Sequence, residues 1–249
     1  MLVLRKLKSM LNRITNFIKV LNLRAKGIPK ITDTKLDREQ IKKLVNKENP
    51  TILEIGCNDG TSTLWLHEMF ENPKVYCFEP DPRAITRFKN KVGQTPNIKL
   101  FELALSDKNG EITFFQSGGA PNPDWAKGMP EGWDFSGSIR PPKEHLKLHP
   151  NITFDNKITV ETKTLDTWCE EQGIENIDFI WMDVQGAEID VFRGATKSLN
   201  KVRFIYTEYN NDELYEGQYN LVQLMSYLKK FKILIRYSGD ILLKNSLLN

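Results

Sequence analysis

The fold of this chain is decided by the stretch Glu54-Ile55-Gly56-Cys57-Asn58-Asp59-Gly60. It follows an apolar run at 51–53 and precedes a helix-like stretch at 61–70. A buried strand that turns through glycines into a helix presents backbone N–H groups at the carboxyl end of the strand. Open α/β sheets bind nucleotide-like ligands at such ends, so the sequence predicts a ligand site at this turn.

The rest of the chain continues an alternation of strand-like and helix-like segments. We predict strands at 51–55, 74–79, 97–105, 177–182 and 202–209, and helices at 33–47, 61–71, 81–92, 165–172 (with Thr164 as N-cap), 187–199 and 218–230. Two apolar runs around Ser238-Gly239 predict a terminal hairpin that adds an antiparallel strand. Such alternation indicates right-handed βαβ units. The predicted fold class is therefore α/β, with a mostly parallel, Rossmann-like sheet.

One region interrupts this alternation. The segment 110–115 reads as an extra strand, introduced by the turn signal Asn109-Gly110, and a second strand is predicted at 158–163. Between them, residues 116–156 read as a loop rich in Gly, Pro and Trp. An irregular insertion of this length in a compact domain is more often functional than filler. We therefore expect an inserted loop and hairpin that contact the substrate.

Charge is distributed unevenly along the chain. The net charge is +3, from 35 basic and 32 acidic residues, but eight basic residues and no acidic one precede Asp33. Without those eight, 27 basic residues face 32 acidic ones, a net charge of −5. We therefore predict two parts, a basic helical segment at 1–48 and an acidic ligand-binding domain at 49–249.

The basic leader has an apolar seam at helical spacing, made by Leu4, Leu7, Leu11, Ile14, Ile18 and Leu21. Three interpretations stay open. The helix docks on its own domain, pairs with a second subunit in a homodimer, or lies on an anionic membrane through residues 1–26. The three cysteines include no C-x-x-C and are read as free thiols of a reducing cytosol. No run approaches the roughly 18 apolar residues of a membrane span, so we expect a cytoplasmic protein, with peripheral membrane contact as the alternative.

Polar and small residues recur where successive predicted strands end. Glu79 ends the second strand, where a carboxylate can accept both hydroxyls of a ribose. Ala104, Leu105 and Ser106 follow the third strand, where an adenine edge can be held, and Asp183 ends the fourth strand. The predicted cofactor contacts are Glu54, Gly56, Asn58, Gly60, Thr61, Glu79, Pro80, Ala104, Leu105, Ser106 and Asp183.

The sign of the charge at the turn separates two classes of ligand. Asn58 occupies the place of the second glycine in the G-x-G-x-x-G spacing of dinucleotide-binding turns. That place must let the backbone approach a pyrophosphate, and Glu54 beside it would repel one. An ammonium and a sulfonium would instead be attracted, so these residues favour S-adenosylmethionine over NAD.

With these features the chain resembles class I S-adenosylmethionine-dependent methyltransferases, and specifically the FkbM family. The matching pieces are Leu53-Glu-Ile-Gly-Cys-Asn-Asp-Gly-Thr-Ser, Phe78-Glu-Pro-Asp-Pro, Glu102-Leu-Ala-Leu-Ser-Asp-Lys-Asn-Gly, Thr164-Leu-Asp-Thr-Trp and Phe179-Ile-Trp-Met-Asp-Val-Gln-Gly-Ala-Glu. The resemblance implies O-methylation of a sugar, a glycan or another polyhydroxylated small molecule. The glutamate that the family commonly carries two residues after the aspartate is Gln185 here, which removes the carboxylate that an acid–base or metal role would use.

A sugar hydroxyl is a poor nucleophile, so a base or charge stabiliser should lie within hydrogen-bond reach of it. Asp183 is the leading candidate because its strand end faces the methyl donor, and Glu208 and the loop residues His145 and His149 are alternatives. In the predicted substrate loop, Trp125, Trp133, Arg140 and His145 combine aromatic faces with hydrogen-bonding groups, which suits sugars.

Other readings of the same residues give different functions. Asp183, Glu188 and Glu208 could hold a divalent cation through oxygen ligands, but we predict no metal site because the motif has no His or second adjacent carboxylate. A non-catalytic S-adenosylmethionine- or nucleotide-binding module is an alternative. The leader could track phosphates of a nucleic acid. The acidic domain behind it and the absence of an N/D-P-P-[YF] motif argue against nucleic-acid methylation.

Overall fold

The computed structural model describes residues 27–33, 36–122, 124 and 132–248. The leader helix predicted for residues 1–26 and the loop residue Trp125 lie outside this part of the chain. Among the described residues, no helix has the length and apolar character needed to cross a membrane.

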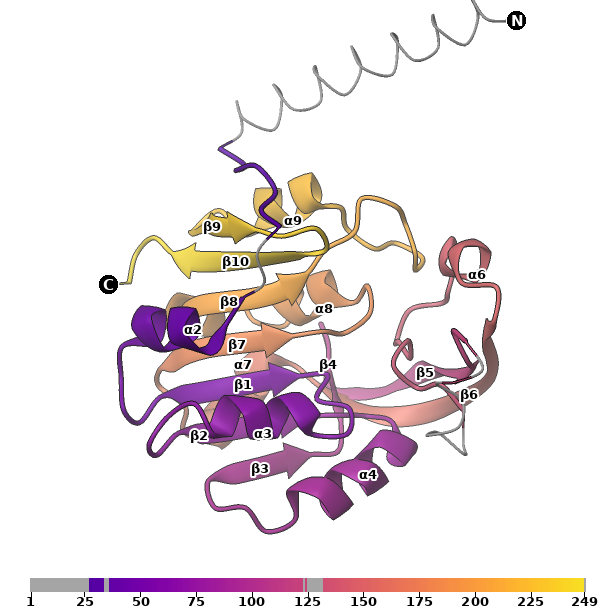
Figure 1. The fold of residues 1–249 in the computed structure, drawn as a ribbon, viewed down its shortest axis with the longest axis horizontal. Helices are drawn as coiled ribbons and strands as arrows, with labels where there is room; N and C mark the ends of the chain where they lie inside the picture. The colour runs from indigo at the N-terminus through magenta and orange to yellow at the C-terminus, as the bar shows by residue number, and fades with distance from the viewer. Residues whose placement is uncertain (1–26, 34–35, 123, 125–131, 249) are drawn as a thin grey trace, which may run out of the picture.

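A seven-stranded sheet forms the centre of the molecule (Figure 1). Its strands, in spatial order, are β3 (Ile98–Phe101), β2 (Lys74–Phe78), β1 (Thr51–Ile55), β7 (Ile177–Met182), β8 (Val202–Glu208), β10 (Asp240–Asn245) and β9 (Phe231–Arg236). The first five strands pair in parallel, while β10 pairs antiparallel with both of its neighbours. This arrangement confirms the predicted α/β class with an antiparallel C-terminal strand.

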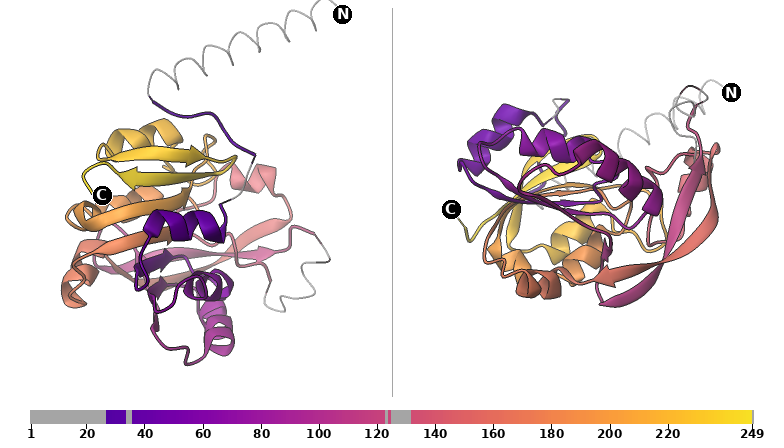
Figure 2. Two further views of the ribbon diagram at one scale, coloured as in Figure 1. Left: turned by 60° about the vertical axis from the view of Figure 1, so that its left-hand side comes forward. Right: turned by 90° about the horizontal axis from the view of Figure 1, so that it is seen from below.

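Helices cover both faces of this sheet, as the view from below shows (Figure 2). The helices α2 (Arg38–Val45), α3 (Thr61–His67) and α4 (Pro82–Val92) cover one face, and α7 (Leu165–Glu171), α8 (Glu188–Arg193) and α9 (Leu221–Tyr227) cover the other. Side chains of β1 alternate between the two layers, because Ile52 joins the core under α2–α4 while Leu53 and Ile55 join the core under α7–α9. The sheet is thus buried on both faces, as parallel sheets are.

The strand order reverses direction between β1 and β7. From β1 the chain runs outward through β2 and β3. After residues 104–163, which we call the insertion, it returns to place β7 on the other side of β1. The backbone N–H of Asp183 donates to the carbonyl of Ile55 over 2.9 Å, so the two strands end side by side. Ligands of open α/β sheets bind in the crevice at such a reversal.

A second, smaller sheet is built by the insertion. It has the order β4 (Ala104–Leu105), β6 (Ile152–Lys163) and β5 (Gly110–Gly119), and the short helix α6 (His145–Leu148) precedes β6. The strand predicted at 97–105 is therefore wrong as one element, because its two halves belong to different sheets. The loop predicted at 116–156 also begins and ends within strands, which pair with each other across the hairpin.

Most predicted helices are present but shorter than predicted. The helix predicted at 187–199 ends at Arg193, with Gly194 as its C-cap. Glycine is required at 194, because a Cβ added there would lie 2.0 Å from the carbonyl oxygen of Ser106. A single 3₁₀ turn, Ser198–Lys201, follows. The predicted N-cap Thr164 is confirmed, since its side chain accepts the backbone N–H of Thr167.

Candidate active site

The glycine turn at residues 54–60 is fixed by backbone contacts to its neighbouring strands. The N–H groups of Gly56 and Cys57 both donate to the carbonyl of Phe78, over 2.9 and 3.1 Å. Gly56 has φ +84°, and a Cβ added there would lie 1.9 Å from the carbonyl oxygen of Asp183. Only glycine therefore fits at this position, because the turn lies directly against the end of β7.

Asn58 continues the turn in a backbone conformation that glycine usually adopts, with φ +44°. Its N–H donates to one carboxyl oxygen of Glu79 over 2.9 Å, and the other oxygen accepts the N–H of Asp81 over 2.9 Å. The turn and the end of β2 are thus joined through one carboxylate. Burial raises the pKa of Glu79 to about 8.

An open cleft of about 630 Å³ lies between the glycine turn, the ends of β2 and β7, and the insertion. The titratable side chains that line it are all carboxyl groups, namely Glu79, Asp134 and Asp183, and no Lys or Arg is among the described lining residues. Phe78, Leu103, Leu105 and Phe114 make an apolar wall. A cleft with this lining suits a flat apolar group that carries positive charge and opposes a pyrophosphate.

The structure separates the predicted cofactor contacts into two groups. Those that line the cleft are Gly56, Asn58, Glu79, Pro80, Ala104, Leu105 and Asp183. Glu54, Gly60, Thr61 and Ser106 are not among the lining residues. The cleft is therefore formed mainly by residues at strand ends. Glu54 and the start of α3, at Gly60 and Thr61, do not line it.

Glu54 points to the opposite face of β1. Its carboxyl accepts the hydroxyl of Thr63 on α3, and the thiol of Cys77 lies 3.9 Å away. Burial raises the pKa of Glu54 to about 8, so the group is neutral at pH 7. This placement differs from the sequence expectation, in which a charged Glu54 attracted the cofactor.

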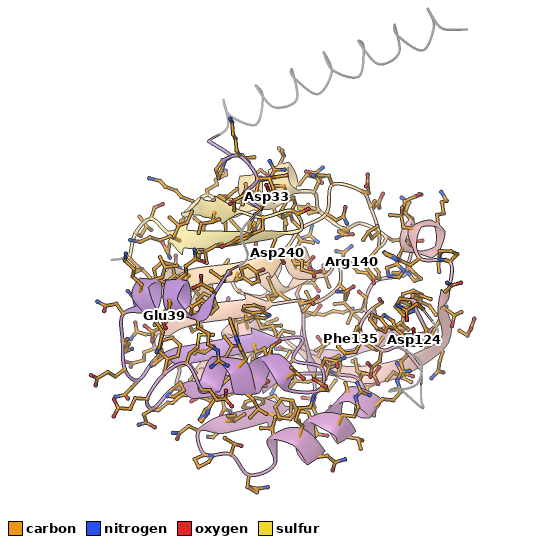
Figure 3. All side chains as sticks on the ribbon, viewed as in Figure 1. Asp33, Glu39, Asp124, Phe135, Arg140 and Asp240 are labelled. Atoms are coloured by element: carbon orange, nitrogen blue, oxygen red, sulfur yellow. The ribbon has the colours of Figure 1, made fainter. Side chains whose placement is uncertain are left out.

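The far side of the cleft is closed by residues 132–140, which we call the roof segment. Figure 3 shows Phe135 and Arg140 of this segment on the side where the strand ends face the insertion. Asp134 forms an ion pair with Arg87 of α4, and the hydroxyl of Ser138 donates to the carbonyl of Gln185 over 2.8 Å. The hydroxyl of Tyr215 donates to the carbonyl of Ser136 over 2.8 Å. The roof segment is therefore held by contacts with three separate parts of the fold.

A group of buried and half-buried acids lies at the end of β7 and β8. The side-chain amide of Gln185 donates to Asp183 over 2.6 Å and lies 3.4 Å from Glu208. Burial and the charge of Asp183 raise the pKa of Glu208 to about 10, and burial also raises the pKa of Asp183. Burial raises the pKa of Glu188 to about 7. Glu208 therefore holds a proton, while Asp183, which lines the cleft, is placed to take one.

Known proteins agree with this geometry. The domain described as "Methyltransferase FkbM domain" matches residues 54–233. The chain belongs to the FkbM methyltransferase family. It is 45% identical over 226 residues to the 2-O-methyltransferase NoeI of Sinorhizobium fredii, covering 89% of this chain and 90% of that protein. It is 23% identical to the hexuronic acid methyltransferase AglP of Haloferax volcanii, covering 72% of this chain and 64% of that protein.

This FkbM methyltransferase uses S-adenosylmethionine, as the sequence predicts. The cleft fits that cofactor by its chemistry. Its acidic lining matches a sulfonium and an ammonium, and its apolar wall matches an adenine.

Two predicted substrate residues, Arg140 and His145, contact other residues of the methyltransferase and do not line the cleft. Arg140 binds both carboxyl oxygens of Asp190, over 2.6 and 2.8 Å, and does not line the cleft. His145 is 4% exposed and packs its ring 5.4 Å from that of Tyr215 and 4.8 Å from that of His149. Burial lowers the pKa of His145 to about 4, so the side chain is neutral at pH 7. It packs against Tyr215 and does not line the cleft.

Trp133 supports the roof segment from within. Its indole N–H donates to the hydroxyl of Ser136 over 3.0 Å, and its ring centre lies 4.9 Å from that of Phe135. Phe135 is 39% exposed and lines the cleft, so it presents the aromatic surface that sequence reasoning assigned to tryptophans. In the described part of the chain, no group of three His, Cys, Asp or Glu side chains is arranged to hold a metal ion.

Sequence reasoning missed Asp134 and Tyr215. Asp134 is a lone acid between two aromatic residues in a segment that reads as a loop, and its partner Arg87 lies on a different predicted element. Tyr215 lies between the predicted strand and helix of another βα connection. An aspartate flanked by two aromatic residues is the one local sequence signal that could have drawn attention to this segment.

Proposed function

We propose that this enzyme transfers a methyl group to a hydroxyl of a neutral sugar or glycan. The observation that carries the proposal is the position of Asp183, a half-buried carboxylate in the cleft on the same lining as the exposed ring of Phe135. The similarity to a 2-O-methyltransferase over 89% of this chain supports an oxygen acceptor. The name of the archaeal relative, a hexuronic acid methyltransferase, supports a sugar.

Residues of the cleft can hold the cofactor in one orientation. Glu79 ends β2, where a carboxylate accepts ribose hydroxyls, and Leu103, Ala104 and Leu105 offer an apolar slot for the adenine. Gly56 lets the backbone approach the ligand closely, because it has no side chain on the turn. When bound, S-adenosylmethionine supplies an electrophilic methyl group and leaves as a neutral thioether.

Asp183 acts as the base in this proposal. As the acceptor oxygen becomes an ether oxygen, its proton passes to a carboxyl oxygen of Asp183. The raised pKa of Asp183 makes it a stronger base than an exposed aspartate. Gln185 orients the carboxylate by donating to Oδ1. Glu208 keeps its own proton, since its pKa is about 10.

The roof segment provides the acceptor contact. The exposed ring of Phe135, supported by Trp133, offers an apolar face for the C–H groups of a sugar ring. No Lys or Arg is among the described residues that line the cleft, so no cation there is placed to pair with the carboxylate of a hexuronic acid. We therefore propose a neutral sugar as the acceptor.

The experiment is transfer of labelled methyl from S-adenosylmethionine to two matched panels, neutral hexosides and hexuronides. We expect transfer to the neutral panel alone. In Asp183→Asn, turnover should fall by about 10²–10⁴-fold, because the base is lost. Binding of S-adenosylhomocysteine, measured by calorimetry, should stay within about threefold.

Three results would contradict the proposal. Transfer to neither panel would support a non-catalytic binding module. Preferred transfer to hexuronides would reject the neutral acceptor. Full turnover in Asp183→Asn would remove Asp183 as the base. Asp178→Asn is the matched control, because Asp178 is a carboxylate on β7, the strand that Asp183 follows, but pairs with Lys47 and Arg203 outside the cleft lining.

A further inference from the structure

Asp134 is a buried carboxylate whose role the proposed mechanism does not use. Its side chain has no exposed surface, and it lines the cofactor cleft. It comes from the roof segment and reaches across to Arg87 of α4 and Asn58 of the glycine turn. Burying an ionised carboxylate without a partner costs free energy of folding, so the fold requires this contact with Arg87.

The two oxygens of Asp134 have different partners. Oδ2 accepts from the guanidinium of Arg87, which satisfies the charge. Among the residues that the structure describes, Oδ1 accepts only from the side-chain amide of Asn58, over 3.4 Å. That distance exceeds the usual range of such bonds, so Oδ1 keeps capacity to accept a stronger donor.

Three parts of the cofactor suit a carboxylate, namely the ribose hydroxyls, the sulfonium centre and the α-ammonium, and the cleft has three carboxylates. The ribose hydroxyls fit Glu79 at the end of β2, and the reacting centre faces Asp183 at the end of β7. The third group is the α-ammonium of the amino-acid part, and the third carboxylate is Asp134, beside Asn58 of the glycine turn. Glu54 cannot serve, because it lies on the other face of β1 against Thr63.

We infer that Asp134 of the roof segment binds the α-ammonium of the cofactor, the role that the sequence assigns to Glu54. Arg87 is the positioning residue, because it holds Asp134 from α4 without lining the cleft. The insertion that covers the acceptor side then also completes the cofactor site. The inference uses the proposed places of Glu79 and Asp183, but its test involves no acceptor.

The test compares two ligands that differ only at the amine. S-adenosylhomocysteine carries the α-ammonium, and its desamino analogue lacks it. Calorimetry on the wild-type protein and on Asp134→Asn gives four dissociation constants. We expect Asp134→Asn to weaken binding of S-adenosylhomocysteine about tenfold or more, since hydrogen bonds to charged groups are the strong ones. Binding of the desamino analogue should change less than about threefold.

Two further variants act as controls. Glu54→Gln should leave the preference for the amine unchanged. Asp178→Asn removes a buried carboxylate with two cationic partners outside the cleft lining, and it should also keep the preference. If Asp134→Asn does not fold, as judged by circular dichroism, Asp134→Glu replaces it. That variant keeps the charge but moves it by one methylene, and the same amine-selective loss is expected.

Certain outcomes overturn the inference. Equal loss for both ligands would place Asp134 on the ribose or give it a purely structural role. Unchanged affinity for both would remove it from the cofactor site. An amine-selective loss in Glu54→Gln would return the role to the glycine turn. Because none of these measurements uses a sugar, they do not depend on the acceptor proposed above.

Discussion

The glycine turn at 54–60 and the roof segment at 132–140 border the same cleft, but different kinds of contact hold them. The turn is fixed by backbone groups, as when the N–H groups of Gly56 and Cys57 share the carbonyl of Phe78. Side chains are the main ties of the roof segment to the ligand-binding edge, chiefly Asp134 to Arg87 and Tyr215 to Ser136. A backbone-held element tolerates changes in most side chains, whereas the roof segment depends on a few of them.

The largest effect is expected from Gly56→Ala, which attacks the turn at its least tolerant point. The new Cβ would lie 1.9 Å from the carbonyl oxygen of Asp183, at a φ of +84°. Left-handed strain and overpacking together should cost about 3 kcal/mol or more, and binding of S-adenosylhomocysteine should be lost. Chemical denaturation and calorimetry measure the two effects.

Gly173→Ala is the control for that substitution. Gly173 has φ +63°, but a Cβ added there meets no atom within 4 Å. Only the backbone strain remains, about 1–2 kcal/mol, and ligand affinity should be unchanged. Equal losses in the two variants would show that close approach to Asp183 is unimportant.

We expect Tyr215→Phe to weaken the attachment of the roof segment. The hydroxyl of Tyr215 lies 2.8 Å from the carbonyl of Ser136 and 3.1 Å from the side-chain oxygen of Gln185. Its removal leaves these buried acceptors without that donor, which should cost about 1–3 kcal/mol. Turnover should fall about tenfold, since Gln185 orients Asp183, while the dissociation constant of S-adenosylhomocysteine changes less than about threefold.

Tyr237→Phe is the matched control for this prediction. Tyr237 is 4% exposed, and its buried hydroxyl has no hydrogen-bond partner within the described part of the chain. The loss of that hydroxyl should therefore leave stability and turnover unchanged or slightly improved. A larger loss in Tyr237→Phe than in Tyr215→Phe would mean that the hydroxyl of Tyr215 does not hold the roof segment.

The same contrast explains what could be predicted from the sequence. The strands and helices around the turn were predictable because apolar periodicity and the glycines are local signals. The ends of β5 and β6 were not, since Gly118, Gly119 and the polar residues near Asn156 read as loop until they pair across the hairpin. The site was predicted at Glu79 and Asp183, which end strands.

Two other parts of the site needed the folded structure. Asp134 acquires its role through Arg87, 47 residues earlier in the chain, and no local pattern joins them. The orientation of Glu54 also depends on Thr63 of α3, because a strand residue can face either layer of helices. The predicted cofactor is therefore right, although Glu54, the carboxyl group on which that prediction relied, is neutral at pH 7 and faces away from the cleft.

Gln185→Glu tests the acid cluster that lies between the two regions. The change puts a further carboxylate beside Asp183 and Glu208, near Glu188 on α8 and Asp240 on β10. Like charges disfavour ionisation, so the pKa of Asp183 should rise further. Since the base must be ionised, the acid limb of the pH dependence of kcat should move upward by about one pH unit. A limb that stays in place would mean that the acid limb does not report Asp183.

The smallest effect is expected from Glu54→Gln, which tests the claim that the turn's own acid is buried and neutral. Burial raises the pKa of Glu54 from 4.5 to about 8, so the folded protein binds a proton that the unfolded chain releases. This contribution to stability is complete below about pH 4.5 and is lost as the pH rises to about 8. Glutamine cannot ionise, so the Tm of Glu54→Gln, relative to wild type, should be higher at pH 9 than at pH 5. Turnover and ligand binding should be unchanged, which makes this the smallest effect on the site. An equal difference at both pH values would mean that Glu54 is ionised in the fold, and a charged Glu54 would again compete with Asp134 for the ammonium.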